Sequence, residues 1–302
     1  MAIAATQLTP TAAVHGLSAT AGVQSLVVTY DFASQRVTSH ASALGSREFM
    51  LRGGHGIYTS MRTVHQRRVF LFDDHLKRLA KSAQNLHHSG RWDSGFWQTL
   101  LVPLVRRGLD EFWGTGERKI TVLIDETRVA LQVEQLHVPH GSCSVQFAMG
   151  KRSNPEIKAL DWVHQRARLE ALIEPPVNEV VLEDGSRFYE GLSSNFFATR
   201  PCSESRFGLE LVSAPLDSVL LGTVMKSVLD VCKQDGISVA YEPDVELERW
   251  SGAFVTSTSR LVLPVSRIVM PDGTAVELVV DPLVDHLRNR ILELAVSRSV
   301  EI

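Results

Sequence analysis

The chain has 302 residues, of which 44% are hydrophobic, so it is long enough to bury a sizeable core in one large or two compact domains. Lys and Arg number 31 against 34 Asp and Glu, a formal net charge of -3, and basic residues are interspersed with acidic ones. This balance excludes the concentrated basic face that a nucleic-acid-binding protein needs. The 3 scattered cysteines are too few for a disulfide framework, so we expect a reducing compartment, by default the cytoplasm.

No stretch of the sequence is apolar for long enough to span a bilayer, so we expect no membrane association. Residues 1–24 lack the basic start and the compact apolar core of a secretory signal. They are rich in Ala, Thr and Ser and contain no acidic residue, which is partly typical of a transit peptide, although its arginines are missing. An organelle therefore stays open as an alternative to the cytoplasm.

The first half of the chain mixes signals for strands and helices. β-Branched and aromatic residues predict strands at 25–30, 68–72, 119–124 and 145–149. Apolar residues at helical spacing predict helices over 73–86, with Asp73 or Asp74 as the cap, and over 96–112. Near Gly150 this pattern ends and a polar loop begins.

The second half shows the same mixture. We expect helices over 160–173, ended by two prolines, over 219–233, stopped at Gly236, and over 282–296. Strands are predicted at 178–182 and 195–199, and a strand, a turn and a second strand at 254–268. Both halves therefore predict mixed α/β or α+β structure, with one domain over 1–150 and a second over 151–302.

Several segments carry side chains suited to carbonyl and phosphate chemistry. Lys158 follows a proline loop at the start of a helix, and a lysine amine can hold an aldehyde as a Schiff base. Glu190 ends a strand before a glycine, and a carboxylate can keep a ring nitrogen protonated. Gly222 and Thr223 open or interrupt a helix, and a Thr-Ser-Thr-Ser run at 256–259 follows a strand, which suits a phosphate. A glycine-rich segment at 53–63 leads to Arg62.

The order of these segments resembles the fold-type IV, or class IV, aminotransferases, which depend on pyridoxal 5'-phosphate (PLP). This family includes branched-chain and D-amino acid aminotransferases and 4-amino-4-deoxychorismate lyase. The resemblance covers roughly residues 53–265. It rests on the glycine-rich segment, on His75-Leu76-Lys77-Arg78-Leu79 with Ser82-Ala83, on Lys158, on Glu190-Gly191-Leu192-Ser193-Ser194-Asn195-Phe196, on 220–224 and on 256–265.

The resemblance implies a role for each matching position. Lys158 would be the Schiff-base lysine and the catalytic residue that moves a proton between the substrate Cα and the cofactor. Glu190 would face the pyridine nitrogen, and Arg62 would bind the phosphate. The other implied cofactor-binding residues are Thr223 and Val224, through their backbone N–H groups, and Ser257 and Thr258, through their hydroxyls. No metal is implied.

The resemblance implies a two-domain, homodimeric PLP enzyme that moves an amino group between a small amino acid and a 2-oxo acid. Two alternatives stay open. One is a 4-amino-4-deoxychorismate lyase, which releases pyruvate and p-aminobenzoate. The other is a catalytically silent relative that only binds PLP.

The chain departs from the family pattern at several positions. Val224 stands where relatives often have threonine, and Met225 where they often have arginine. Branched-chain members have a tyrosine shortly after the lysine, whereas this chain has Trp162, Val163 and His164. The missing tyrosine weakens an expectation of branched-chain specificity, and Val224 and Met225 motivate the silent alternative.

Some residues have simpler explanations than chemistry. Lys158 could be an ordinary surface lysine, and Tyr58 a plain strand aromatic instead of a pocket residue. His137, His140 and Cys143 are spaced loosely like metal ligands, but a fourth partner is missing and Pro139 indicates a loop, so we expect a linker there.

Overall fold

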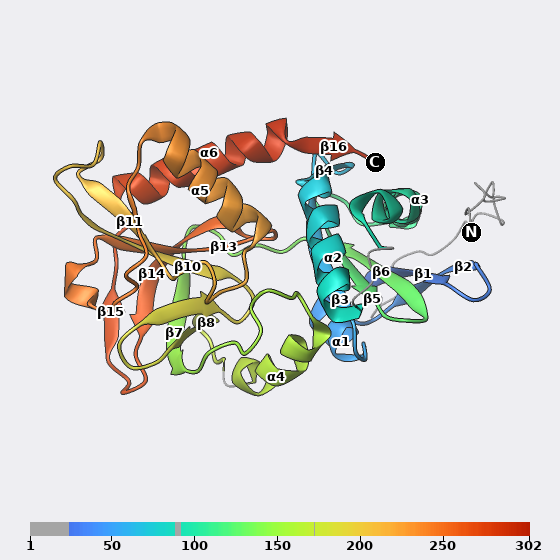
Figure 1. Cartoon of the computed structure of the whole chain (residues 1–302), viewed down its shortest axis with the longest axis horizontal. Helices are drawn as coiled ribbons and strands as arrows, with labels where there is room; N and C mark the ends of the chain where they lie inside the picture. Colours follow the sequence, from blue (N-terminus) through green and yellow to red (C-terminus); the bar gives the residue numbers. More distant parts are fainter. Residues whose placement is uncertain (1–23, 88–91, 172) are drawn as a thin grey trace.

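The computed structural model describes residues 24–87, 92–171 and 173–302, which form two β-sheets side by side with helices packed against them (Figure 1). The Ala-rich segment up to residue 23, with its transit-peptide composition, lies outside the described residues. Among the helices that are described, none is both long and apolar enough to cross a membrane.

The first sheet has seven strands in the order β16-β4-β3-β5-β6-β1-β2, and all its neighbours are antiparallel. The strands are β1 (Ser25–Asp31), β2 (Val37–Ser42), β3 (Ile57–Val64), β4 (Arg68–Phe70), β5 (Arg118–Ile124), β6 (Arg128–Gln135) and β16 (Ser299–Glu301). The helices α1 (Ser46–Leu51), α2 (Phe72–His87), α3 (Ser94–Glu111) and α4 (Leu160–Glu170) pack on it.

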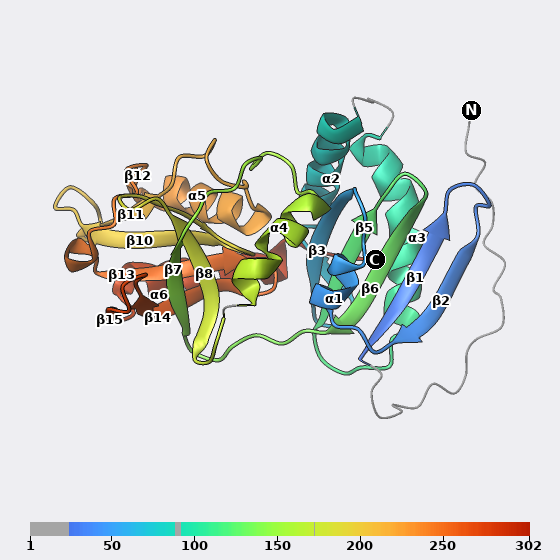
Figure 2. The ribbon, with the colours of Figure 1, turned by 90° about the horizontal axis from the view of Figure 1, so that it is seen from below.

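Side chains of the first sheet alternate between two faces, as the period of a strand requires. Ile57 and Met61 of β3 pack with residues of α2 and α3 in one apolar cluster. Tyr58, the residue after Ile57, belongs to the cluster on the other face, with Leu160 and Val163 of α4. The sheet is therefore covered on both faces, and Tyr58 points towards α4, which lies at the junction of the two halves (Figure 2).

The second sheet has nine strands in the order β12-β11-β10-β13-β14-β7-β8-β9, with β15 beside β14. The strands are β7 (Cys143–Met149), β8 (Val177–Glu183), β9 (Phe188–Gly191), β10 (Asn195–Pro201), β11 (Leu209–Ser213), β12 (Val239–Ala240), β13 (Gly252–Ser257), β14 (Leu261–Val269) and β15 (Ala275–Glu277). The helices α5 (Thr223–Asp235) and α6 (Pro282–Ser297) and the 3-10 turn η1 (Leu247–Arg249) complete this half.

Six strands of the second sheet close into a ring, because β9 pairs with β8 on one side and with β10 on the other, through Asn195 and Glu190. Phe196 points into this ring, where it contacts Phe147 and Trp250 edge-on or tilted. Phe197 faces outwards and packs in the cluster that includes α5 and α6. The closure brings Glu190 beside Asn195 at one rim of the ring.

The mixed α/β fold with two sheets confirms the predicted fold class. The predicted strands at 25–30, 119–124 and 145–149 are β1, β5 and β7, and the predicted last helix is α6, whose start Asp281 caps by accepting from Val284 N–H. Gly236 ends α5 in the left-handed conformation, with φ of 68°, as predicted.

Several boundaries differ from the predictions. The helix predicted from 219 begins at Thr223, since Gly222 is extended, and the helix predicted to 173 ends at Glu170. The strand predicted over 68–72 ends at Phe70, because Leu71 has a φ of 53°. The predicted domain boundary at 150 falls directly after β7, which pairs within the second sheet, and the division into two domains stays a prediction.

Candidate active site

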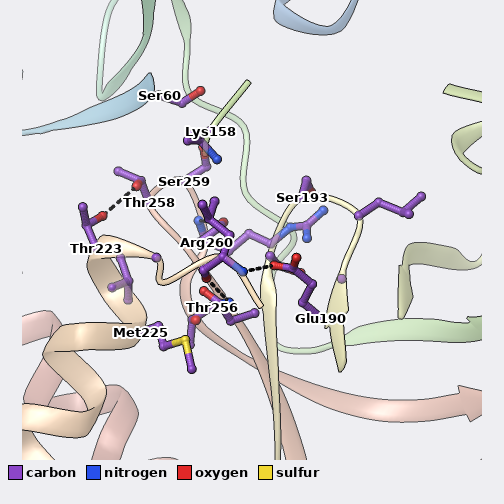
Figure 3. A pocket seen from close by; sticks show the side chains of 18 of the residues that line it. Ser60, Lys158, Glu190, Ser193, Thr223, Met225, Thr256, Thr258, Ser259 and Arg260 are labelled. Carbon is purple, nitrogen blue, oxygen red and sulfur yellow. Dashed lines mark hydrogen bonds between the residues drawn. The ribbon is translucent and has the colours of Figure 1, made fainter. Parts of the chain in front are cut away.

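A cavity of about 320 Å³ lies between the two halves of the chain, and both halves contribute to its wall. It includes six of the seven positions predicted to bind a cofactor: Lys158, Glu190, Thr223, Val224, Ser257 and Thr258. Figure 3 shows Thr223 and Thr258 on one side of this cavity, Glu190 and Ser193 on the other, and Lys158 above them. Segments up to 100 residues apart in the sequence, from Lys158 to Thr258, therefore meet in one place.

Lys158 projects into the cavity from the segment that leads into α4. Its carbonyl accepts the backbone N–H of Tyr58 at 3.0 Å, and its own N–H donates to the hydroxyl of Ser82 at 3.3 Å. The carbonyl of Gly56 accepts the backbone N–H of Leu160. Only glycine fits at position 56, because a Cβ there would be 2.3 Å from the carbonyl oxygen of Ile124 in β5. The backbone around Lys158 is thus tied to the start of β3, and its side chain lines the cavity, unlike that of an ordinary surface lysine.

The electrostatic surroundings of Lys158 depress its basicity. Burial among protein atoms and the nearby guanidinium groups of Arg78, Arg152 and Arg166 lower the pKa of Lys158 to about 8, although Tyr58 opposes them. A substantial fraction of this amine is therefore neutral near physiological pH, and a neutral amine is the nucleophilic form.

Glu190 lies at the end of β9, almost completely buried at 3% exposure. Its Oε2 accepts the backbone N–H of Leu220 at 3.1 Å, and Arg152 Nη1 lies 3.9 Å from its Oε1. Burial raises the pKa of Glu190 to about 7, while Arg152 and the Leu220 N–H oppose this rise. The carboxyl therefore takes up or releases a proton easily in the free cavity.

The start of α5 forms one end of the cavity. The hydroxyls of Thr223 and Thr258 lie 3.4 Å apart and both residues are buried. The first N–H groups of a helix have no partner within it and attract anions. Gly222 lets this helix start approach Asn195, since a Cβ at Gly222 would be 2.4 Å from the side-chain oxygen of Asn195. Two hydroxyls and a helix N-terminus are thus gathered at this end.

Arg62 is not among the residues that line the cavity. It is on the outer part of β3, where its Nη1 donates to the carbonyl of Ser259 at 3.0 Å. Arg78 of α2 does line the cavity, and its Nη2 donates to the hydroxyl of Thr59 at 2.6 Å. Burial lowers the pKa of Arg78 to about 10, so it still carries its positive charge.

Two arginines of the wall, Arg152 and Arg166, have no role predicted from the sequence, and Tyr58, which the sequence leaves open as a pocket residue, does line the cavity. Arg152 Nη2 donates to the carbonyl of Ile157 at 2.6 Å, and Arg166 Nε pairs with Glu170 at 2.8 Å while its Nη1 donates to Leu192 O. The spacing of four residues between Trp162 and Arg166 was the available signal, since such residues share one helix face and both here reach the carbonyl of Leu192.

The segment with His137, His140 and Cys143 connects the two sheets. His137 lines the mouth of the cavity, whereas Cys143 is buried at the start of β7. In residues 24–87, 92–171 and 173–302, no cluster of three His, Cys, Asp or Glu side chains is arranged to hold a metal ion.

The residues of the cavity fit an aromatic cofactor that carries a phosphate. Within the described part of the chain, Glu190 Oε1, Arg78 Nε and Thr256 Oγ1 are buried and have no hydrogen-bond partner. Buried polar atoms normally find a partner, so these three are available to a bound group. A carboxyl, a guanidinium, hydroxyls and a reactive amine together match a ring nitrogen, a phosphate and an aldehyde.

Comparisons with known proteins agree with this arrangement. The sequence profile of the family described as amino-transferase class IV matches residues 56–268. No curated protein matches the chain.

Solved structures share the fold. One is a hypothetical aminotransferase from Mycobacterium tuberculosis in its PLP-bound form, with 17% identity, a TM-score of 0.69, and coverage of 90% of this chain and 99% of that one. Another is a branched-chain aminotransferase from Thermoproteus uzoniensis with norvaline, with 18% identity, a TM-score of 0.66, and coverage of 90% and 95%. A third is an aminotransferase from Brucella abortus bound to PLP, with 20% identity, a TM-score of 0.63, and coverage of 89% and 99%.

Proposed function

The chain belongs to the class IV aminotransferase family, and from this premise we propose that it binds PLP through Lys158 and moves an amino group between a small amino acid and a 2-oxo acid. The family membership confirms the resemblance found in the sequence. The observation that carries the proposal is the meeting of the Lys158 amine, the Glu190 carboxyl and the hydroxyls of Thr223 and Thr258 in one cavity.

Lys158 is the residue that we propose to be catalytic. When bound, PLP supplies an aldehyde that condenses with amines and a pyridinium ring that withdraws electrons from the substrate Cα. Lys158 Nζ would hold the cofactor between turnovers and, once released, would accept and return the Cα proton. The lowered pKa of about 8 suits both tasks, because such an amine exchanges its proton readily near neutral pH.

Glu190 would face the ring nitrogen and hold a proton there. Its raised pKa reflects a buried carboxyl without a full cationic partner, and a protonated ring nitrogen would provide that partner. Leu220 N–H fixes Oε2, which leaves Oε1 as the oxygen available to the ring.

Arg78 is the arginine that we propose to bind the phosphate, together with the start of α5 and the hydroxyls of Ser257, Thr258 and Thr223. Arg78 lines the cavity with a free Nε, whereas Arg62 reaches the carbonyl of Ser259 and would act through that turn. Val224 would contribute only its backbone N–H, since its side chain packs in the apolar cluster of α5.

Two further proposals concern the whole protein. A homodimer remains an expectation from the family. The cytoplasm remains a proposal that is supported by the three free cysteines, Cys143, Cys202 and Cys232. Sedimentation of the purified chain and the location of a tagged copy in cells would test these points.

The decisive experiment compares the native protein with Lys158→Ala, and with Lys151→Ala as a matched control, because Lys151 is exposed and does not line the cavity. After incubation with PLP and reduction with borohydride, the native protein and the control should carry the cofactor mass on the residue 158 peptide. Lys158→Ala should lack it and should lose transamination by about 10²-fold to 10⁴-fold. A cofactor fixed at another lysine would overturn the proposal.

The same preparation separates the alternative functions. Panels of L- and D-amino acids with a 2-oxo acid acceptor should show amino transfer. Pyruvate released from aminodeoxychorismate without an acceptor would instead indicate the lyase, and bound PLP without reaction toward any amino acid would indicate the silent relative.

A further inference from the structure

Tyr58 is held beside Lys158 by the backbone. The segment before α4 pairs with the start of β3 through a bridge between Ile57 and Ala159, and Tyr58 N–H donates to the carbonyl of Lys158 at 3.0 Å. The Nζ of Lys158 lies 4.6 Å from the centre of the Tyr58 ring. Tyr58 is only 3% exposed, so its hydroxyl must find its partners inside the cavity.

The hydroxyl of Tyr58 faces several positive charges. Arg166 Nη1 of α4 lies 3.5 Å from it, and the charges of Arg152 and Arg78 also act on the phenol. From α2, His75 also interacts with Lys158, but burial, Arg78 and Lys158 hold its pKa well below its ordinary value, so it adds no charge. The anionic counterpart on the C-terminal side is Glu190 of β9.

These surroundings change the acidity of the phenol and the amine together. Burial would raise the pKa of Tyr58, but Lys158, Arg166 and Arg152 outweigh it and bring the pKa down to about 7. Burial lowers the pKa of Lys158 to about 8, and Tyr58 is the group that opposes this lowering. Two groups so coupled titrate as a pair, in which a phenolate and an ammonium coexist near neutral pH.

We propose that Tyr58 and Lys158 form a phenolate–ammonium pair that shares one proton at the base of the cavity, so that Tyr58 is the positioning residue that stores the proton of Lys158. This inference rests on the proposed role of Lys158 and extends it to a residue of β3. Tyr58 is the one tyrosine among the described residues that line the cavity.

The proton balance of the pair is closed. When the amine of Lys158 condenses with an aldehyde, the proton moves from Nζ to the Tyr58 oxygen, and the neutral amine forms the new C–N bond while the carbonyl oxygen leaves as water. When another amine displaces Lys158, Nζ is released neutral and can accept and return the Cα proton, and the proton of Tyr58 returns to Nζ only after that transfer. The pair therefore keeps its own proton throughout. This matters because the charges of Arg78, Arg152 and Arg166 would oppose the uptake of a new proton from solvent.

The first test needs no cofactor. Ultraviolet absorbance of the full chain, prepared without PLP and titrated with base, should show one tyrosine that ionises near neutral pH. Tyr58→Phe should lose this transition, whereas Tyr241→Phe, on an exposed residue, should keep it. Lys158→Met should move the transition upward by about one pH unit or more, because the cation that lowers the pKa of Tyr58 most is gone. A native titration identical to that of Tyr58→Phe would overturn the proposal.

The second test measures PLP binding instead of turnover. The rate at which PLP adds to Lys158 depends on the neutral amine, so its pH profile reports the pKa of that amine. Loss of the phenolate in Tyr58→Phe should shift the profile to lower pH, and an unshifted profile in a variant with native unfolding behaviour would refute the shared proton. If PLP does not add at all while the tyrosine still titrates near neutral pH, the pair stands and the proposed function fails.

Discussion

The two walls of the cavity differ in chemistry. The C-terminal wall consists of turns and element ends, and it offers backbone N–H groups, the hydroxyls of Thr223 and Thr258, the carboxyl of Glu190 and one cation, Arg260, which is paired with Glu179 at 2.6 Å. The opposite wall is formed by the N-terminal sheet, α2, α4 and the segment leading into α4. It offers a phenol and several cations, among them Arg78 and Arg166.

This difference indicates a division of tasks. Neutral hydroxyls and N–H groups can bind an anion with little dependence on pH, because they do not titrate. The cations around Lys158 shift the pKa of every ionisable group that faces them, and such perturbed groups are typical of sites that move protons. We therefore expect large and pH-dependent effects from the ionisable residues and small, uniform effects from the hydroxyls.

The largest effect in this series is expected for Glu190→Gln. Gln has the same shape but cannot hold a positive charge on the ring nitrogen, and loss of one preorganised electrostatic contact typically costs about 10²-fold to 10³-fold in kcat. Steady-state kinetics should show this fall with the PLP content unchanged. Activity within a few-fold of the native value would contradict the role of Glu190, and Glu183→Gln on the neighbouring strand β8 is the control.

The same substitution should change how stability depends on pH in the cofactor-free protein. The pKa of Glu190 is raised from 4.5 to about 7, so the folded state binds this proton more tightly than the unfolded chain does. Its contribution to the free energy of unfolding is therefore present at low pH and is lost as the pH rises from 4.5 to about 7.

Glu190→Gln should remove that loss. Relative to the native protein, its free energy of unfolding should improve between pH 5 and pH 8 by at most about 3 kcal/mol, since one pKa unit corresponds to about 1.36 kcal/mol. Urea unfolding at both pH values measures the difference. A constant difference would mean that Glu190 titrates like an ordinary carboxyl.

The next largest effect is expected on PLP affinity, where substitutions of Arg78 and Arg62 should differ. Arg78→Gln should weaken PLP binding by about 1.5–3 kcal/mol, the usual contribution of a hydrogen bond to a charged group. Arg62→Gln should cost less than about 1 kcal/mol, because Arg62 reaches the backbone of Ser259 instead of the cavity. Titration with PLP, beside unfolding midpoints of both variants, checks the order, and the reverse order would restore the assignment made from the sequence.

The contrast between the walls also explains which residues of the site can be predicted from the sequence. Glu190, Thr223 and Thr258 lie in or next to turns, where glycines and a strand or helix end mark the position along the chain. Tyr58 lies within a regular strand, and its place beside Lys158 depends on the pairing of Ile57 with Ala159, about 100 residues apart. Arg78 lies within a regular helix, and its direction depends on the packing of α2 on β3, where it contacts the hydroxyl of Thr59. Such long-range contacts leave no local signal, so the sequence predicts Arg62 for the phosphate, gives Arg78 no role and leaves Tyr58 open between pocket and plain strand residue.

The smallest effect is expected at the start of α5. Thr258→Val keeps the shape but removes one neutral hydroxyl, so PLP affinity should fall by about 0.5–1.5 kcal/mol, to a similar extent at pH 6 and pH 8. Val224→Thr is the matched opposite change, and it should not improve binding, because Val224 is 1% exposed and packs in the apolar cluster beneath the helix. A gain in affinity from Val224→Thr would show that this side chain can turn towards the phosphate, and the C-terminal wall would then have more hydroxyl capacity than its packing indicates.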